Sequence, residues 1–353
     1  MNHMAGSEYL QWAKTRKPGR FSLSTSGVAD YSIAELGARI EDVELNGDSL
    51  YGYQPLQEAI AAHCGAPAES VVAACGASMA NFLALAALIE PGDEVAIEDP
   101  VYEPLLAAVS YFGGSIRLFT RGVESGFQVP APEKVITPRT KLIILTNLHN
   151  PSCVLTADSI LRRYGEIARS VGARVLIDEV YLECMYEKFQ SAFRHGPEFV
   201  ITSSLTKAYG LGGLRCGWIL AEPELAQRMW KVKDLIDPGA PHPAELLSVI
   251  AFNNLDRIGE RARSLLAKNR ELVREFLNGC DELECVWPEF GTCIFPRLKR
   301  GDAERFVNVL HERYETDVVP GKFFGMPDHF RLGIGPETAI VAAGLERLKT
   351  ALA

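Results

Sequence analysis

Between residues 70 and 220, short apolar runs typical of strands alternate with longer runs in which apolar residues recur at helical spacing. The strand-like runs are VVAAC, EVAIED, SIRLFT, KLIILTN, RVLIDEV, FVITSSLT and GWIL, and the helical runs include SMANFLALAALIE and ADSILRRYGEIARSVG. This alternation constrains the fold because parallel strands need a long, usually helical, crossover between them. We therefore predict an α/β fold with a mostly parallel sheet and helices on both faces.

The pattern changes after residue 222. Long helical segments run to about residue 278, and short strand-like runs then alternate with helices. A chain of 353 residues also exceeds one ordinary core, which favours two domains. We predict a large sheet domain over residues 46–265 and a smaller α+β domain made of residues 266–353 and an N-terminal arm, residues 1–45.

Charge and hydropathy exclude several classes of partner. The formal net charge is −9, and phosphate backbones are bound by basic faces, so we expect no nucleic acid partner. The longest apolar stretch, residues 82–89, is too short to cross a bilayer. The first residues show no basic region followed by an apolar signal core, so we expect a cytoplasmic protein with no membrane partner.

The eight cysteines are scattered, and no two have the two-residue spacing of a zinc or redox site. We expect free thiols packed as small hydrophobes in a reduced cytoplasm, and no metal site. Cys153 and Cys184 flank the motifs described next, but no paired histidine supports a nucleophilic cysteine.

Lys207 lies in SSLTKAYGLGGLRCGW, where it follows a strand-like run and enters a glycine-rich loop that leads to Arg215. A lysine in this setting is typical of a phosphate cradle or of a cofactor bound as an imine. The Walker sequence is absent, and GLGGLR does not directly follow a strand as a dinucleotide-binding turn does. Taken alone, the segment favours an ordinary surface lysine.

Polar residues stand where two predicted strands end, the edge at which open α/β sheets bind ligands. Asp178 ends the buried strand of VLIDEVY, where a carboxylate is costly unless it meets a cation such as a protonated pyridine nitrogen. Asn147 and Asn150 follow another strand in NLHNPS. An asparagine here either donates to a phenolate-like oxygen or serves an ordinary turn.

Three further segments have both a functional and an ordinary interpretation. Tyr102 in EDPVYEP follows a strand, where its ring stacks on an aromatic cofactor or packs in the core. Residues 76–78 in CGAS begin a helix, which binds an anion through free N–H groups or is simply capped. Arg331 in FRLGIG stands between apolar residues, where a surface ion pair explains it less well than a ligand does.

Seven segments in chain order, YGYQPLQEAIA, GASMA, DPVY, NPS, DEVY, SSLTKAYGLGGLRCGW and FRLGIG, resemble the motifs of class I/II aminotransferases of pyridoxal-phosphate fold type I. The resemblance spans about residues 45–335, and Ser204, Lys207 and Arg215 stand at the family's spacing. It implies a pyridoxal-phosphate enzyme that moves the α-amino group of an amino acid to a 2-oxo acid. It also implies a homodimer with shared active sites.

The resemblance implies roles for the matching residues. Lys207 would hold the cofactor as an imine and later move a proton. Asp178 would keep the pyridine nitrogen protonated, Asn150 and Tyr181 would hydrogen-bond the cofactor's 3′-oxygen, and Tyr102 would stack on the ring. The remaining implied contacts are Gly76, Ala77, Ser78, Ser204 and Arg215 to the phosphate, and Arg331, Asn150 and Gly27 to the substrate.

Parts of the sequence depart from the family pattern. The tyrosine that reaches the phosphate of the neighbouring subunit is missing from NGDSLYG, where Asn46 or Tyr51 takes its place. Cys153 stands where the N-P-[ST]-G turn usually has glycine. The N-terminal arm, with Tyr9 and Trp12, and with Phe21 further along, either covers the site or packs on the surface.

The motifs serve more than one reaction, because one fold supports several chemistries. Arg331 argues against loss of the substrate carboxylate, so we place transamination first and an amino-acid lyase or cyclase of the same fold second. A non-catalytic pyridoxal-phosphate-binding protein is a third alternative. It predicts loss of Lys207, Asp178 or Arg331, or an added DNA-binding segment, and all three residues are present.

Overall fold

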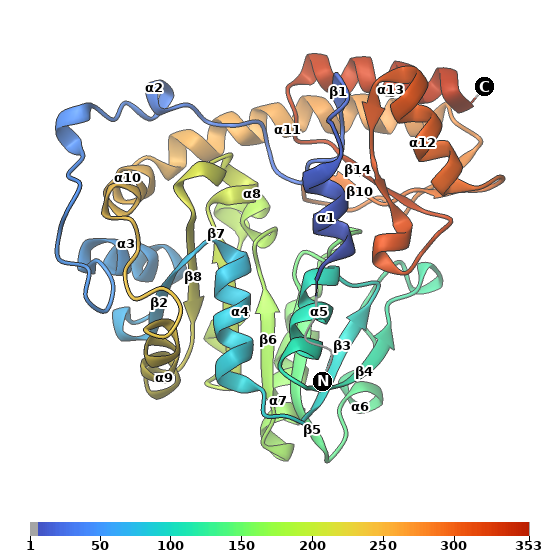
Figure 1. Ribbon diagram of the computed structural model, residues 1–353. Coiled ribbons are helices and arrows are strands. Elements are labelled where there is room, and N and C mark those ends of the chain that lie inside the picture. The colour runs from blue at the N-terminus through green and yellow to red at the C-terminus, as the bar shows by residue number, and fades with distance from the viewer. Residues whose placement is uncertain (1–5, 353) are drawn as a thin grey trace.

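A seven-stranded sheet in the order β2-β8-β7-β6-β5-β3-β4 forms the centre of the computed structural model, which describes residues 6–352 apart from the side chains of residues 187 and 188 (Figure 1). Residues 1–5 of the expected N-terminal arm and residue 353 lie outside the described part. The strands of this sheet are β2 (Val71–Cys75), β3 (Glu94–Asp99), β4 (Ser115–Thr120), β5 (Thr140–Thr146), β6 (Arg174–Asp178), β7 (Phe199–Ser204) and β8 (Cys216–Leu220).

All strand pairings in this sheet are parallel except those of β8, which is antiparallel to both β2 and β7. The prediction of a mostly parallel α/β sheet is therefore confirmed. The reversal follows from a short connection, because residues 205–215 between β7 and β8 hold only a four-residue helix and a single 3-10 turn. A parallel return would need a crossover of a dozen or more residues.

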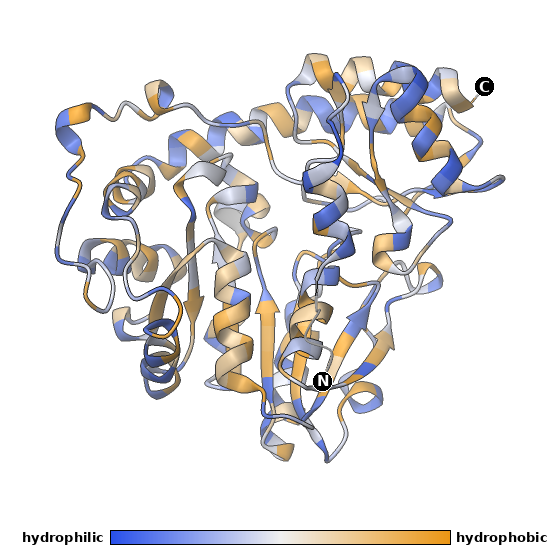
Figure 2. Cartoon of the chain, in the orientation of Figure 1, coloured by the Kyte–Doolittle hydropathy of each residue, from blue (hydrophilic) through white to orange (hydrophobic). Residues whose placement is uncertain are grey.

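Alternate residues of each strand pack on opposite faces of the sheet. Along β5, Leu142 and Ile144 belong to one apolar cluster, whereas Ile143 and Leu145 belong to the other, as the two-residue period of a strand requires. Figure 2 shows α4 and β6 as mostly hydrophobic, in keeping with helices that cover both faces. The helices packed around the sheet are α3 (Gln54–Cys64), α4 (Ala77–Leu88), α5 (Glu103–Tyr111), α6 (Pro132–Val135), α7 (Asp158–Val171), α9 (Pro223–Lys233) and α10 (His242–Phe252).

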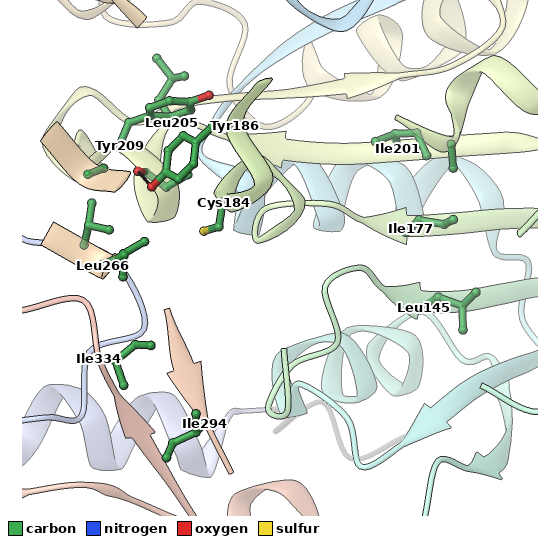
Figure 3. Packing of buried hydrophobic residues seen from close by; sticks show 14 of the residues in the cluster. Leu145, Ile177, Cys184, Tyr186, Ile201, Leu205, Tyr209, Leu266, Ile294 and Ile334 are labelled. Atoms are coloured by element: carbon green, nitrogen blue, oxygen red, sulfur yellow. Dashed lines mark hydrogen bonds between the residues drawn. The ribbon is translucent and has the colours of Figure 1, made fainter. Parts of the chain in front are cut away.

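The C-terminal part contains three long helices and short strands. The apolar run 292–298 is divided at Phe295-Pro296 into two short strands, because proline has no N–H for the ladder. Figure 3 shows the core of the sheet continuing through Leu266 to Ile294 and Ile334 of this part. Its elements are α11 (Leu255–Asn278), α12 (Ala303–Tyr314), α13 (Thr338–Leu352), β9 (Leu283–Glu284), β10 (Cys293–Ile294), β11 (Arg297–Leu298), β12 (Thr316–Asp317), β13 (Val319–Pro320) and β14 (Phe330–Gly333).

The N-terminal segment packs against the C-terminal part of the chain. It contains α1 (Glu8–Thr15), β1 (Phe21–Ser22) and α2 (Ile33–Leu36), and β1 pairs in parallel with β12. The domain boundary proposed at residue 265 falls inside α11, which runs unbroken across it. The two-domain division stays a prediction.

Two features that would indicate a membrane or a metal partner are absent from the described residues. No helix in this part of the chain is long and apolar enough to cross a membrane. Nor do the described His, Cys, Asp and Glu side chains form a cluster of three or more that could hold a metal ion.

Candidate active site

A pocket opens at the carboxyl ends of β5, β6 and β7, at the junction with the C-terminal part. It brings together ten of the twelve predicted site residues, all except Gly27 and Gly76. Parallel strands end at one edge of a sheet, so residues from distant segments meet there. The lining residues are Tyr9, Leu10, Ser26, Ala77, Ser78, Asn81, Tyr102, Thr146, Asn150, Asp178, Val180, Tyr181, Ser204, Thr206, Lys207, Arg215 and Arg331.

Lys207 lies on α8 (Thr206–Tyr209), a four-residue helix, and not in the loop that the glycine-rich sequence suggested. The loop begins one residue after the helix, at Gly210, which has a φ of 69°. Burial lowers the pKa of the Lys207 amine to about 8, and the nearby Arg331 charge acts in the same direction. A large fraction of this amine is therefore neutral near pH 8 and able to act as nucleophile or base.

Asp178 is the last residue of β6 and is buried. Its Oδ2 accepts a hydrogen bond from Asn81 Nδ2 at 2.7 Å, and its Oδ1 accepts one from the Val180 N–H at 3.0 Å. Thr202 Oγ1 donates to Asn81 Oδ1 at 2.5 Å and so fixes the amide. Burial raises the pKa of Asp178 and outweighs the opposite effects of these hydrogen bonds and of the Lys207 charge. None of the described side chains forms an ion pair with Asp178. A cation in the pocket would supply the missing partner.

The first turn of α4 forms the opposite end of the pocket. Gly76 caps this helix without a side-chain hydrogen bond, so the N–H groups of Ala77 and Ser78 are free for an anion. Arg215 Nη2 donates to the Cys75 carbonyl at 3.1 Å, and a Cβ at position 76 would lie 2.2 Å from the same nitrogen. Gly76 is therefore needed for the close approach of Arg215, although it does not line the pocket itself.

Ser204 ends β7 beside this anion-binding end and is fully buried. Tyr181 is also buried, and Tyr102, the residue before α5, lies beside the Ser78 side chain. Burial raises the pKa of both tyrosines, so both phenols carry their proton at neutral pH. The two side chains can therefore act as hydrogen-bond donors or as apolar surfaces.

The two asparagines of NLHNPS have separate positions. Asn150 lines the pocket, and its Oδ1 accepts a hydrogen bond from Arg331 Nη1 at 3.0 Å. This leaves the Asn150 amide N–H groups as donors for a ligand. Asn147 does not line the pocket, because its Oδ1 accepts from the Thr156 N–H at 3.1 Å. Only Asn150 belongs to the site.

Arg331 on β14 is buried, which rules out the surface ion pair that was its ordinary interpretation. Besides Asn150, its acceptors are the Tyr9 hydroxyl at 2.9 Å and the Ser24 carbonyl at 3.4 Å, both bound to Nη2. Its Nε is buried without a hydrogen-bond partner, and no described carboxylate forms an ion pair with it. A buried guanidinium bound only to neutral acceptors has the chemistry of a carboxylate site.

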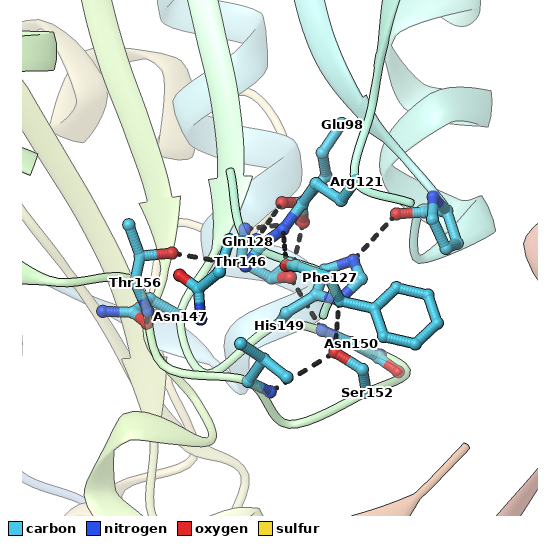
Figure 4. Close-up of polar contacts among 12 residues, drawn as sticks. Glu98, Arg121, Phe127, Gln128, Thr146, Asn147, His149, Asn150, Ser152 and Thr156 are labelled. Carbon is cyan, nitrogen blue, oxygen red and sulfur yellow. Dashed lines mark hydrogen bonds and ion pairs between the residues drawn. The ribbon is translucent and has the colours of Figure 1, made fainter. Parts of the chain in front are cut away.

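A buried polar network lies behind the Asn150 turn (Figure 4). Arg121 Nη1 donates to Glu98 Oε2 at 2.7 Å, and Glu98 Oε1 accepts from the Thr146 hydroxyl at 2.5 Å. The same hydroxyl accepts from the Asn150 N–H at 2.8 Å. The ion pair therefore positions the backbone of Asn150 through a single threonine.

Cys153 lies in the turn after Asn150 with a φ of 57°, a left-handed conformation that favours glycine. Its Sγ lies 3.2 Å from that of Cys293, and both thiols are buried and free. A Cβ at Gly291 would lie 2.6 Å from the Cys153 sulfur. The side chain at 153 thus occupies space that the absence of a side chain at 291 leaves open.

The remaining predicted residues lie outside the lining of the pocket. Gly27 is adjacent to the Lys207 backbone, where its Cβ would lie 3.4 Å from the Lys207 Cα, but Ser26 is the neighbour that lines the pocket. Asn46 and Tyr51 are exposed, and the Tyr51 hydroxyl donates to Asp234 Oδ2 at 3.2 Å. Neither reaches the pocket of its own chain.

Several lining residues were missed from the sequence. Asn81 had a usable signal, because it is a lone asparagine in an otherwise apolar helical run. Thr146 and Thr206 adjoin motifs but carry no pattern of their own. Tyr9 was named only as part of the arm, and it and Leu10 line the pocket. The arm therefore covers the site at these two residues, whereas Trp12 packs against Phe323.

These groups fit pyridoxal phosphate. The pocket holds a lysine with a lowered pKa, a buried carboxylate without an ion pair, and a helix N-terminus without a side-chain cap beside an arginine. These are the partners that a carbonyl carbon, a pyridinium nitrogen and a phosphate require. Together with the sheet topology, they define a pyridoxal-phosphate-dependent enzyme of fold type I.

Comparison with known proteins identifies the family. The model of the family "Aminotransferase class I and II" matches residues 41–348, and the chain therefore belongs to this family. Among curated relatives, an aspartate aminotransferase of Geobacillus stearothermophilus is 26% identical over 80% of this chain and 75% of its own length. Capreomycidine synthase of Streptomyces vinaceus is 25% identical over 97% of this chain and 92% of its own length.

Solved structures agree with this family. A pyridoxal-phosphate-dependent aminotransferase from Streptococcus suis superposes with a TM-score of 0.92 at 26% identity, over 98% of this chain and 96% of that one. The pyridoxal-phosphate-dependent cyclase OrfR superposes with a TM-score of 0.89 at 27% identity, over 98% and 97% of the two chains. The family resemblance and the cofactor predicted from the sequence are confirmed.

Proposed function

We propose that the enzyme transfers the α-amino group of an amino acid to a 2-oxo acid. The observation that carries the proposal is Arg331, a buried guanidinium in the wall of the pocket with only neutral acceptors. A substrate carboxylate would complete its hydrogen bonds with a charge-assisted pair. The same pocket contains the Lys207 amine, so a substrate bound by its carboxylate shares the pocket with a base.

In this proposal, the residues around the ring control one proton. Bound pyridoxal phosphate supplies an electron-withdrawing ring that accepts the electron pair left when the substrate Cα loses a proton. Lys207 holds the cofactor covalently and, once released, moves the proton at Cα through Nζ, which its lowered pKa favours. Asp178, oriented by Asn81, holds the proton on the pyridine nitrogen.

The other pocket residues bind and orient. Asn150 and Tyr181 donate to the 3′-oxygen of the cofactor, and Tyr102 packs against its ring. Arg331 retains the substrate carboxylate, which disfavours decarboxylation. We assign the phosphate to Gly76, Ala77, Ser78, Ser204 and Arg215, and the substrate to Arg331, Asn150 and the segment around Gly27.

The proposal has a direct test. The purified holoenzyme should be yellow, and borohydride should fix the cofactor on Lys207, which peptide mass mapping would show. With a panel of amino acids, 2-oxo acid should form only when an acceptor 2-oxo acid is present. A colourless Lys207→Ala variant that still turns over substrate would contradict the assignment.

A second candidate reaction is elimination followed by ring closure on an amino acid. The observation that favours it is coverage, since capreomycidine synthase matches 97% of this chain and the aspartate aminotransferase 80%. Such a reaction needs a substrate with a leaving group at Cβ and an internal nucleophile. The two reactions differ in acceptor dependence.

A mass balance separates the two candidates. Transamination consumes an acceptor and releases one oxo acid for each amino group moved. Elimination with ring closure needs no acceptor and yields a product that lacks the leaving group and the one proton released by the internal nucleophile. Ammonia released without an acceptor identifies simple elimination.

We propose that two copies of the chain form a two-fold dimer with shared active sites. Apolar residues in the segment 40–50 and in the turn after α9 are exposed, among them Ile40, Leu45, Leu50 and Leu235, as expected of a surface that another copy covers. Tyr51 lies in this region and is our candidate for the cross-subunit phosphate contact. Sedimentation of wild type and Leu45→Asp should show a dimer and a monomer.

We further propose that the enzyme works in the cytoplasm. The supporting observation is that all eight cysteines are free thiols, as expected in a reducing compartment. Fractionation of cells that make the protein, followed by thiol labelling, checks this.

A further inference from the structure

The N-terminal helix α1 lies between α5 and the C-terminal part of the chain (Figure 1). At its start, the Glu103 carboxylate on α5 accepts hydrogen bonds from the Ser7 hydroxyl, from the Glu8 N–H at 2.9 Å and from the Tyr9 N–H at 3.0 Å. One turn further along, Trp12 packs on Phe323 with ring centroids 5.5 Å apart. The helix thus contacts both the large sheet side and the C-terminal part.

These contacts fix the side chain of Tyr9 over the pocket. Its ring lies 6.0 Å from the Tyr102 ring and 6.0 Å from the Phe324 ring, measured between centroids. Its hydroxyl accepts a hydrogen bond from Arg331 Nη2 at 2.9 Å. Because a guanidinium only donates, the Tyr9 hydroxyl must be the acceptor in this bond, and its own proton is free for another acceptor.

We propose that Tyr9 is a substrate-binding residue that shares the α-carboxylate with Arg331, and that α1 is the element that completes this subsite. The inference rests on the proposed function, because it assumes a substrate with an α-carboxylate. A carboxylate oxygen bound to Arg331 accepts the free Tyr9 proton in a charge-assisted hydrogen bond. The hydroxyl thus contributes to selection of amino acids over amines.

The order of α1 depends on these few contacts. The helix has eight residues and none of them is buried, and a helix this short is marginal by itself in water. The Glu103 carboxylate stabilises it by binding its first N–H groups, where a negative charge is favourable. A ligand carboxylate that binds Tyr9 adds one more contact and should order α1 further.

The test compares Tyr9→Phe with wild-type holoenzyme. The probe is the 2-methyl derivative of the amino acid that wild type accepts best, because it has no proton at Cα and only binds. Visible absorbance then gives its dissociation constant. We expect Tyr9→Phe to raise this constant about ten-fold and to leave binding of the corresponding 2-methyl amide, which has no carboxylate, unchanged.

Hydrogen exchange of the α1 amides gives a readout that is independent of turnover. The 2-methyl amino acid should slow exchange of residues 10–15 in wild type, but not in Tyr9→Phe or Glu103→Gln. Tyr31→Phe is the matched control, since the Tyr31 hydroxyl donates only to the Glu35 carbonyl, at 3.3 Å, and it should behave as wild type.

Three outcomes would overturn the inference. Equal binding of the 2-methyl amino acid to wild type and Tyr9→Phe would remove the hydroxyl from the subsite. Equal weakening of the acid and the amide would reduce Tyr9 to ring packing. A wild-type enzyme that binds no amino acid would refute the proposed function first, and the inference with it.

Discussion

Arg121 and Arg331 are 0% and 1% exposed, yet their surroundings differ. Arg121 binds the Glu98 carboxylate, the Phe127 carbonyl and the Thr156 hydroxyl. Arg331 has no carboxylate among the described side chains and keeps an Nε without a partner. For Arg121, these contacts offset the free-energy cost of burying the charge. For Arg331, a bound ligand would have to offset that cost.

The two buried carboxylates show the same contrast. Glu98 pairs with Arg121 and accepts two hydrogen bonds from Thr146, whereas Asp178 accepts only from neutral groups, Asn81 and the Val180 N–H. The complete pair lies behind the Asn150 turn, and the incomplete groups line the pocket. Buried charges without an ion pair therefore mark the site, whereas the buried charges behind the site are paired with each other.

The largest expected effect is a loss of activity on substitution of Asp178, the buried carboxylate without an ion pair. Asp178→Ala should lower kcat/KM by roughly 10³, because the cofactor nitrogen loses the partner of its proton. The free energy of unfolding of the cofactor-free protein should stay the same or increase, because the substitution removes a buried carboxylate that has no ion pair. Steady-state kinetics and urea unfolding check the two halves. A loss of stability without a loss of rate would contradict the comparison.

The two arginines should respond in opposite ways. Arg121→Met leaves Glu98 unpaired and should reduce the free energy of unfolding by about 3–5 kcal/mol. Arg331→Met leaves no unpaired carboxylate, so stability should hold while KM for amino acids rises sharply and KM for amines does not. Urea unfolding of both variants, with KM measured for an amino acid and its amine, decides between the two roles. Equal loss of stability would remove the distinction.

Lys207, another buried group of the pocket, should make the free energy of unfolding depend on pH. Its pKa falls from 10.5 to about 8 on folding, so between these values the unfolded chain binds more protons than the folded chain. Lys207 should therefore contribute on the order of 3 kcal/mol of added stability to the cofactor-free protein as pH increases from about 8 to 10.5. Buried thiols with raised pKa values, such as Cys216 and Cys285, act in the opposite direction over the same range. Urea unfolding should therefore show that wild type gains stability relative to Lys207→Met as pH rises, which isolates the Lys207 contribution.

The smallest expected effect comes from Thr146, which connects the Arg121–Glu98 ion pair to Asn150. Thr146→Val removes the hydroxyl that bonds both Glu98 and the Asn150 N–H, and should cost about 1–3 kcal/mol of unfolding free energy. Thr350→Val, at an exposed helix position where the hydroxyl bonds the Glu346 carbonyl, is the matched control. Equal urea midpoints for the two variants would show that the link has no energetic weight.

Most of the sheet was predictable from the sequence, since its strands are short, largely apolar runs and five of the seven end in a polar residue. The direction of β8 was not. Apolar runs look alike in either direction, and only the length of residues 205–215 carried information on the return. The short strands of the C-terminal part were also obscured, because two-residue strands leave almost no period to read.

The site was predictable where it depends on strand ends. Asp178, Asn150 and Ser204 follow or end neighbouring parallel strands, so one rule brings them together. Tyr9 depends on a helix whose position is set by Glu103, about a hundred residues away, and no local pattern encodes that contact. Arg331 was assigned through its motif, but the absence of a carboxylate partner becomes visible only in three dimensions.

The contact between Cys153 and Gly291 makes two distant positions interdependent. A side chain is present at 153, where the Cys153 turn departs from the N-P-[ST]-G pattern, and absent at 291, where a Cβ would overlap the sulfur. In a chimera that exchanges one half of the chain with a relative that has glycine at 153 and a side chain at 291, this contact would receive either two side chains or none. The first case crowds the turn that carries Asn150, and the second leaves a void next to it, so donor segments must be chosen with both positions in view.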